Sequence, residues 1–131
     1  MQNSFNHTIA GAVISLFFLD SLSISQAQDL QTPVVTVIHI DAMPQFTKSA
    51  AHLLFGFRND SLREAGAKGF EVLQEIDHPN HFTLVEEWRS EEAYEAHNIT
   101  VQTRHFRDQL QPMLGSPFDE RIHEELIAVP Y

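Results

Sequence analysis

The sequence predicts an α+β domain in which helices cover one face of a four-stranded antiparallel sheet, with the element order β-α-β-β-α-β. Residues 34–41 are rich in β-branched side chains, which favour strands. Two alternating runs flank the polar turn at residues 77–80, so they should pair as a hairpin. Apolar residues at helical spacing follow both the first strand and the hairpin.

The first strand and the first helix are expected over residues 34–65. One strand face carries Val34, Thr36, Ile38 and Ile40, and the other carries Val35, Val37, His39 and Asp41. Pro44 suits the first turn of a helix, where its missing N–H costs nothing. Apolar residues then recur at helical spacing, namely Phe46, Ala50, Leu53, Leu54, Phe57 and Leu62. Gly66 suits the left-handed residue that ends the helix.

The hairpin is expected to join a strand at residues 69–76 to a strand that ends at Trp88. Phe70, Val72 and Ile76 share one face of the first of these strands. One face of the second carries Phe82, Leu84, Glu86 and Trp88. Glu86 therefore lies among large apolar side chains, where a charge is costly unless it is paired or lies in a cavity.

The second helical region is expected to begin after Ser90, a good N-cap, and to pass through His97. Residues 98–103 break the pattern, and a second helical piece follows at 104–114. A final strand is expected at 119–129. The order is the ferredoxin-like split arrangement. Because the uncovered sheet face also carries apolar residues, two sheets should face each other in a homodimer, as a dimeric α+β barrel.

The amino-acid composition limits the classes of molecule that the protein could bind. The chain has 8 basic and 18 acidic residues among 131, a formal charge of −10, and its basic residues are scattered. This balance argues against nucleic acid, which needs clustered Lys and Arg. There is no cysteine, which excludes disulfides and thiolate chemistry. A hydrophobic content of 43% with ten phenylalanines is typical of a packed globule.

Residues 1–27 are interpreted as a signal peptide, followed by a linker at 28–33 and the domain at 34–129. Residues 10–19 form an apolar run of the right length, and Ser25 and Ala27 supply small residues at a cleavage site. No Lys or Arg precedes Lys48, so an unprocessed N-terminus is the alternative. We therefore expect export to the periplasm or medium, with no membrane association after processing, or a cytoplasmic protein if the signal is not processed.

An ordered string of motifs resembles the antibiotic biosynthesis monooxygenase domain over about residues 34–127. The motifs are Arg63-Glu64-x-Gly66, Phe70-x-Val72, Pro79-x-x-Phe82-x-Leu84-x-Glu86-x-Trp88, Glu91-x-Ala93 and Ala96-His97. The resemblance implies the dimeric α+β barrel. Members of the family include quinol monooxygenases, polyketide anthrone oxygenases, haem-degrading enzymes, aldehyde or signal-molecule processing proteins and proteins of no known activity.

Individual positions narrow the set of family activities that the resemblance implies. Anthrone-oxidising members have a Trp on this strand and a Tyr six residues later, which Trp88 and Tyr94 match, but their Asn is replaced by Leu84. Haem-degrading members have an Asn on the first strand, a Trp in the second helix and an axial His. The corresponding positions here hold Ile38, His97 and about Leu110. The pattern is therefore closest to the quinol monooxygenases.

His97 is the candidate catalytic base, since histidine titrates near neutral pH, and the alternative is a structural His bonded to the backbone. Trp88 could form a wall for a planar substrate or fill the core. Glu86, Tyr94 and His105 are candidate substrate-binding residues. For Glu86 the alternative is a structural pair with Arg63 or another cation.

Metal and cofactor signatures are weak. His78 and His81 lie in the hairpin turn without an obvious third ligand, so no metal site is expected. The sequence has no nucleotide or flavin signature, and no cofactor is expected.

Three functions follow from these residues. The first is a cofactor-independent monooxygenase that oxidises a quinol or related electron-rich aromatic with O₂. The second is a non-enzymatic exported dimer that binds a small apolar ligand. The third and remotest is an isomerase or lyase that acts on a small carbonyl compound through the same His.

Overall fold

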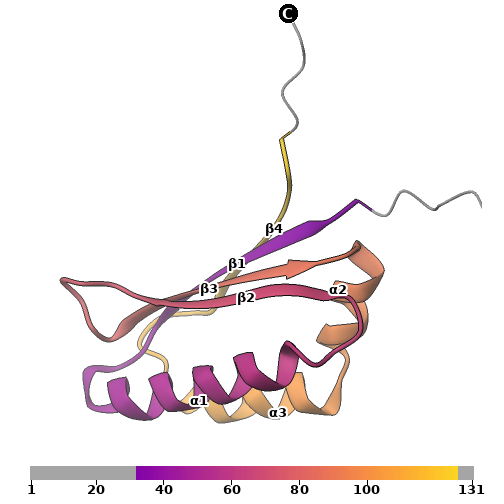
Figure 1. The fold of residues 1–131 in the computed structure, drawn as a ribbon. Helices are drawn as coiled ribbons and strands as arrows, with labels where there is room; N and C mark the ends of the chain where they lie inside the picture. The colour runs from indigo at the N-terminus through magenta and orange to yellow at the C-terminus, as the bar shows by residue number, and fades with distance from the viewer. Residues whose placement is uncertain (1–31, 127–131) are drawn as a thin grey trace, which may run out of the picture.

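In the computed structural model, which describes residues 32–126, four antiparallel strands form one sheet in the order β2-β3-β1-β4. The strands are β1 (Val34–Asp41), β2 (Ala67–Gln74), β3 (His81–Trp88) and β4 (Asp119–Glu124). The helices are α1 (Thr47–Ser61), α2 (Glu91–Asn98) and α3 (Val101–Leu110), with 3-10 turns η1 (Pro44–Phe46) and η2 (Gln111–Met113). Figure 1 shows α1 and α3 lying side by side beneath the sheet. The predicted α+β, ferredoxin-like fold is confirmed.

Parts of the predicted organisation lie outside the described residues. These are the signal peptide at 1–27, most of the linker at 28–33 and residues 127–129 of the predicted last strand. Within the described residues that strand ends at Glu124, so its prediction for residues 125 and 126 is wrong. Among residues 32–126, no helix is long and apolar enough to cross a membrane.

The first helix and the strand after it were predicted with the wrong bounds. Helix α1 ends at Ser61, not at residue 65, because successive turns follow it, with Arg63 N–H donating to Asp60 O and Glu64 N–H donating to Ser61 O. Strand β2 begins at Ala67, with a register shift before Gly69, and ends at Gln74. The prediction that Ile76 shares a strand face with Phe70 and Val72 is therefore wrong: Ile76 lies beyond the strand and is 93% exposed.

The predicted break at residues 98–103 is too long. Helix α3 begins at Val101 because Thr100 caps it, its hydroxyl accepting from the Thr103 N–H at 3.0 Å. The helix buries Thr103, Phe106 and Leu110. The first buried position of α3 is therefore a threonine. Because threonine is polar, the apolar spacing that predicts a helix does not begin until later in the sequence.

The core lies between the sheet and the helices, on the strand faces that the sequence predicts. It contains the β1 residues Val34, Thr36, Ile38 and Ile40 and the β3 residues Phe82, Leu84, Glu86 and Trp88. Phe57 of α1 stacks on Phe106 of α3 with ring centroids 3.7 Å apart, and meets Phe70 of β2 edge-on at 5.6 Å. This aromatic contact holds both helices against the sheet.

A polar layer divides the hydrophobic core in two. Thr36 and Glu86 are paired across β1 and β3, and both are buried. On one side of them the pair Ile38 and Leu84 belongs to the larger apolar cluster. On the other side Val34 and Trp88 belong to a smaller cluster with Tyr94. Two polar side chains thus lie between the two apolar clusters, where apolar side chains would have joined the clusters into one core.

Gly66 gives the first prediction. It has φ +92°, and a Cβ built there would lie 2.5 Å from the Ala93 Cβ. We expect Gly66→Ala to lower the free energy of unfolding by about 2 kcal/mol or more, because the left-handed backbone alone costs an L-residue about 1–2 kcal/mol. Urea denaturation measures the change.

Gly56→Ala is the matched control. Gly56 lies within α1 with nothing within 4 Å of an added Cβ, so the change should stabilise the helix by about 0.5–1 kcal/mol. Equal effects of the two substitutions would contradict this account of the turn.

Candidate functional site

His97 lies near the end of α2 and is turned inward, 2% exposed. Its Nδ1 is 3.1 and 3.0 Å from the two carboxylate oxygens of Glu64, which follows α1. An ionised carboxylate can only accept hydrogen bonds, so Nδ1 carries the proton. The other ring nitrogen, Nε2, is then left with a lone pair and can accept a proton. This is the arrangement that a general base needs.

The Nε2 side of His97 faces the interior. The Trp88 ring lies 4.5 Å from the imidazole ring, centroid to centroid. Trp88 Nε1 donates to Glu86 Oε2 at 3.2 Å, and His97 Nε2 lies 3.9 Å from that same oxygen. The Thr103 hydroxyl lies 3.4 Å from both ring nitrogens. Two of the predicted site residues, Trp88 and Glu86, are therefore brought together with His97.

The polar layer contains two atoms without partners. Glu86 is 1% exposed and Thr36 is fully buried, and neither Glu86 Oε1 nor Thr36 Oγ1 finds a hydrogen-bond partner within residues 32–126. An unpartnered buried polar group costs about 1–3 kcal/mol, and a native structure that keeps one needs a reason. Thr36 and Glu86, which are paired across β1 and β3, thus retain hydrogen-bonding capacity that residues 32–126 do not use.

Burial shifts the ionisation of this cluster. It raises the pKa of Glu86 from 4.5 to about 7, and the hydrogen bond from Trp88 only partly opposes it. It also lowers the pKa of His97 below its usual 6.5, against the opposing effect of Glu64. His97 is therefore neutral at pH 7, while Glu86 takes up and releases a proton near that pH.

Tyr94 lies beside Trp88, but its hydroxyl is directed elsewhere. The two residues pack together with Val34, and the Tyr94 O–H donates to Glu120 Oε1 of β4 at 2.8 Å. Arg107 of α3 pairs with the other oxygen of Glu120 at 2.9 Å. Burial raises the pKa of Tyr94 to about 12. Tyr94 is thus a neutral side wall of the cluster that ties α2 to β4.

His105 does not join the cluster. It is exposed on α3 and lines a shallow hollow of about 260 Å³ between α1 and α3, together with His52 and Gln102. The structure places it apart from Trp88 and His97, which are buried. The proposed pairing of Arg63 with Glu86 is also wrong, because Arg63 is 79% exposed and pairs with Asp60 at 3.4 Å.

Glu64 was missed as a site residue, although the sequence motif contains it. It lies 33 residues before His97, and no local spacing connects the two. Only the turn between α1 and β2 brings them together. The available signal was a Glu two residues before Gly66, whose positive φ marks the point where the chain returns to the sheet.

The hairpin also departs from expectation. His78 and His81 do have a third neighbour with a ligand atom, Glu75, and the three donor atoms lie within 4.8 Å of one another. The expectation that no third ligand accompanies these histidines is wrong.

Comparison with known proteins was used to find the family to which the chain belongs. The model of the family described as antibiotic biosynthesis monooxygenase matches residues 33–109, which is more than half of the chain. No curated protein matches. Among solved structures, a candidate antibiotic biosynthesis monooxygenase from Nitrosomonas europaea matches with a TM-score of 0.69 and 24% identity, covering 73% of this chain and 92% of that one.

Two further structures agree in fold. SO0527 from Shewanella oneidensis has a TM-score of 0.69 and 24% identity over 75% of this chain and 95% of its own. Rv0793 from Mycobacterium tuberculosis has a TM-score of 0.69 and 19% identity over 76% and 100%. These likenesses establish a shared fold. With the family model matched across β1 to α3, the chain belongs to the antibiotic biosynthesis monooxygenase family.

Proposed function

We propose that this chain is a monooxygenase that oxidises a quinol, or a related electron-rich aromatic, with O₂. The observation that carries the proposal is a buried, neutral His97 whose Nδ1 is held by Glu64 and whose Nε2 faces Glu86 and Trp88. Membership of a family of monooxygenases supports the reaction class. The quinol is our choice of substrate, because a phenolic proton is what a neutral imidazole can remove near pH 7.

His97 would act first. Its Nε2 takes the proton of a bound hydroquinone hydroxyl, and the resulting imidazolium is stabilised by Glu64 on the Nδ1 side and by ionised Glu86 on the other. Deprotonation makes the ring a stronger electron donor. Trp88, whose ring lies 4.5 Å from the imidazole, would contact the substrate ring beside His97.

Oxygen would then react with the substrate anion. One electron passes from the anion to O₂, giving a semiquinone and superoxide, and the two radicals combine to a ring peroxide. Loss of water from the peroxide leaves a hydroxylated quinone, so that hydroquinone and O₂ become hydroxyquinone and H₂O. The substrate supplies all the electrons, and for this reason the proposed reaction uses no cofactor.

The unpartnered atoms would hold the substrate. Thr36 Oγ1 and Glu86 Oε1 are on paired strand residues and need hydrogen-bond partners. A second oxygen on a planar ring could bond to both at once. Protonated Glu86 can donate and ionised Glu86 can accept, so this residue suits the substrate and the product in turn. Tyr94 would support Trp88 from the other side.

Non-enzymatic binding of a small, mainly apolar ligand is the second candidate, because one polar group on such a ligand could bond to Thr36 Oγ1 and Glu86 Oε1. It differs in one respect, since a binder does not use the Nε2 lone pair of His97. Binding of a quinol without turnover, unchanged in His97→Ala, would support this function in place of the monooxygenase.

The central prediction concerns His97. With a reduced menadione-type quinol, oxygen consumption should exceed the uncatalysed rate, and His97→Ala should lower kcat by about 100-fold or more, because the proton acceptor is lost. An oxygen electrode measures the rate. The wild-type kcat/KM should change near pH 7, where Glu86 takes up a proton, and should fall further below pH 6.5, since the pKa of His97 lies below that value.

His52→Ala is the matched control, because His52 is exposed on α1 away from the cluster. It should leave the rate unchanged. A His97→Ala protein with the wild-type rate would refute the monooxygenase mechanism.

A second prediction tests the ionisation of Glu86 without any substrate. The carboxyl group of Glu86 loses its proton near pH 4.5 in the unfolded chain but only near pH 7 in the folded protein. Between these two pH values ionisation favours the unfolded chain, so Glu86 lowers the free energy of unfolding as pH rises. Glu86→Gln removes this loss. Its stability relative to wild type should increase by up to about 3 kcal/mol across that range.

Urea denaturation at several pH values measures this difference. Glu87→Gln is the control, because Glu87 is the next residue on β3 and lies exposed on the opposite face. A Glu86→Gln difference that does not vary with pH would argue against a buried, late-titrating carboxyl group.

The homodimer remains part of the proposal. Val35, Val37 and Val85 lie half-buried on the sheet face opposite the helices, and Leu73 there is 49% exposed. A second copy would cover these residues. Light scattering should give twice the chain mass for wild type and the monomer mass for Val37→Glu, whose side chain points away from the core. A monomeric wild type would contradict the dimer.

A further inference from the structure

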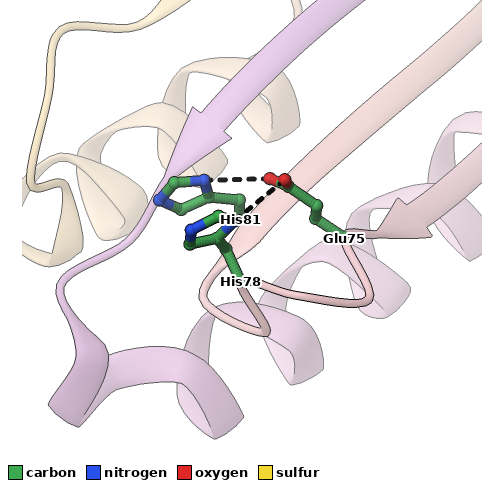
Figure 2. Close-up of side chains that lie close together, drawn as sticks. All are labelled: Glu75, His78 and His81. Carbon is green, nitrogen blue, oxygen red and sulfur yellow. Dashed lines mark hydrogen bonds and ion pairs between the residues drawn. The ribbon is translucent and has the colours of Figure 1, made fainter.

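The tip of the β2–β3 hairpin gathers three side chains with metal-binding donor atoms. His78 Nδ1 lies 2.9 Å from one carboxylate oxygen of Glu75, and His81 Nδ1 lies 3.1 Å from the other. The two imidazole rings are stacked at 5.0 Å with an interplanar angle of 15°. Figure 2 shows both rings side by side with their nitrogens turned toward the Glu75 carboxylate.

The backbone holds this arrangement in place. Glu75 N–H donates to His81 O at 3.0 Å, and His81 N–H donates to His78 O at 2.8 Å, so the turn is closed on itself. The Asn80 side chain donates to Ala42 O at 2.7 Å, and Ala42 N–H donates to Asn80 O at 2.9 Å. These bonds fix the turn to the end of β1. The ligand atoms are therefore positioned before any ion arrives, which lowers the entropy cost of binding.

We propose that Glu75, His78 and His81 bind a divalent transition-metal ion of the zinc type. Two imidazoles and one carboxylate form a donor set that Zn²⁺ accepts, with bonds of about 2.0–2.1 Å. In a tetrahedron with such bonds, neighbouring ligand atoms are about 3.3 Å apart. His78 Nδ1 lies 2.9 Å from Glu75 Oε1 and His81 Nδ1 lies 3.1 Å from Glu75 Oε2, and one ligand atom from each of the three residues lies within 4.8 Å of the others. Small movements of exposed side chains would admit the ion.

Three protein ligands leave one coordination position for water or for a small anion. The site borders a hollow of about 300 Å³ lined by residues of β1, β2 and β3, among them His39 and Thr83. Asp41 Oδ1 lies 3.8 Å from His81 Nδ1, so its carboxylate adds negative charge beside the ion. Glu75 and His78 are exposed and His81 is half-buried, so the ion has a direct route from solvent.

This site is separate from the buried His97 cluster. His81 begins β3 and Trp88 ends it, so the two places are roughly 23 Å apart along the strand. In Figure 1 the β2–β3 hairpin and α2 lie at opposite ends of the sheet. Metal binding at the hairpin can therefore be tested without any reference to oxygenase activity.

Zn²⁺ added to the untagged full chain should bind at one ion per chain in isothermal titration calorimetry. His78→Ala and His81→Ala should each weaken binding by at least about tenfold, because each removes a ligand. Glu75→Gln should weaken it as well, since the neutral amide is a poorer ligand than a carboxylate. Co²⁺ in place of Zn²⁺ should give visible absorption bands that disappear in the two His variants.

His52→Ala is the control for adventitious binding to surface histidines, since His52 is an exposed histidine on α1. It should leave the affinity for Zn²⁺ and the Co²⁺ bands unchanged. Circular dichroism verifies that the variants are folded. Absence of one-to-one binding, or affinity that falls equally in His52→Ala and His81→Ala, would overturn the proposal and leave the hairpin with two His–Glu hydrogen bonds.

Discussion

The burial of Glu86 at the centre of the sheet is the constraint on which the rest of the site depends. A carboxyl group with 1% exposure needs neighbours that make its burial tolerable. Trp88 supplies a hydrogen bond, and the imidazole of His97 lies within 3.9 Å. His97 in turn needs Glu64 to fix its other nitrogen. One buried acid on β3 thus links β3, α2 and the turn after α1, and it divides the apolar core into two clusters.

Among residues 32–126, Glu pairs with His both in the core and at the hairpin, and burial decides how each pair behaves. In the core, burial lowers the pKa of His97 in spite of the adjacent Glu64, so the imidazole stays neutral. At the hairpin, the hydrogen bond from His78 is the largest effect, and it lowers the pKa of Glu75. The first environment suits proton transfer from a substrate. The second keeps a carboxylate ionised in solvent, where a cation can reach it.

Sequence patterns predicted the parts of the fold whose signals are local. The alternation in β1 and β3 identified the buried faces, and Ser90 marked a helix start. The left-handed backbone predicted at Gly66 is confirmed, but Gly66 does not end α1, whose last residue is Ser61. The start of α3 was missed because Thr103 occupies an apolar position. The site was predicted only in part: its histidine, acid and tryptophan are close in sequence, whereas Glu64 and Thr36 reach them through tertiary contacts alone. Spacing along a chain carries no information about such pairs.

Strand β3 carries residues of both the hairpin site and the His97 cluster, and the two sets of side chains do not contact each other along the strand. Its side chains alternate, so Phe82, Leu84, Glu86 and Trp88 face the helices, while Thr83, Val85 and Glu87 face the other way. His81 at the start of the strand is anchored to the hairpin and to the end of β1, and not to the core. Between the hairpin and Glu86, the side chains of β3 that face the helices are Phe82 and Leu84, and both are packed in the larger apolar cluster. The two sites should respond to substitution independently, which is what allows each proposal to fail without the other.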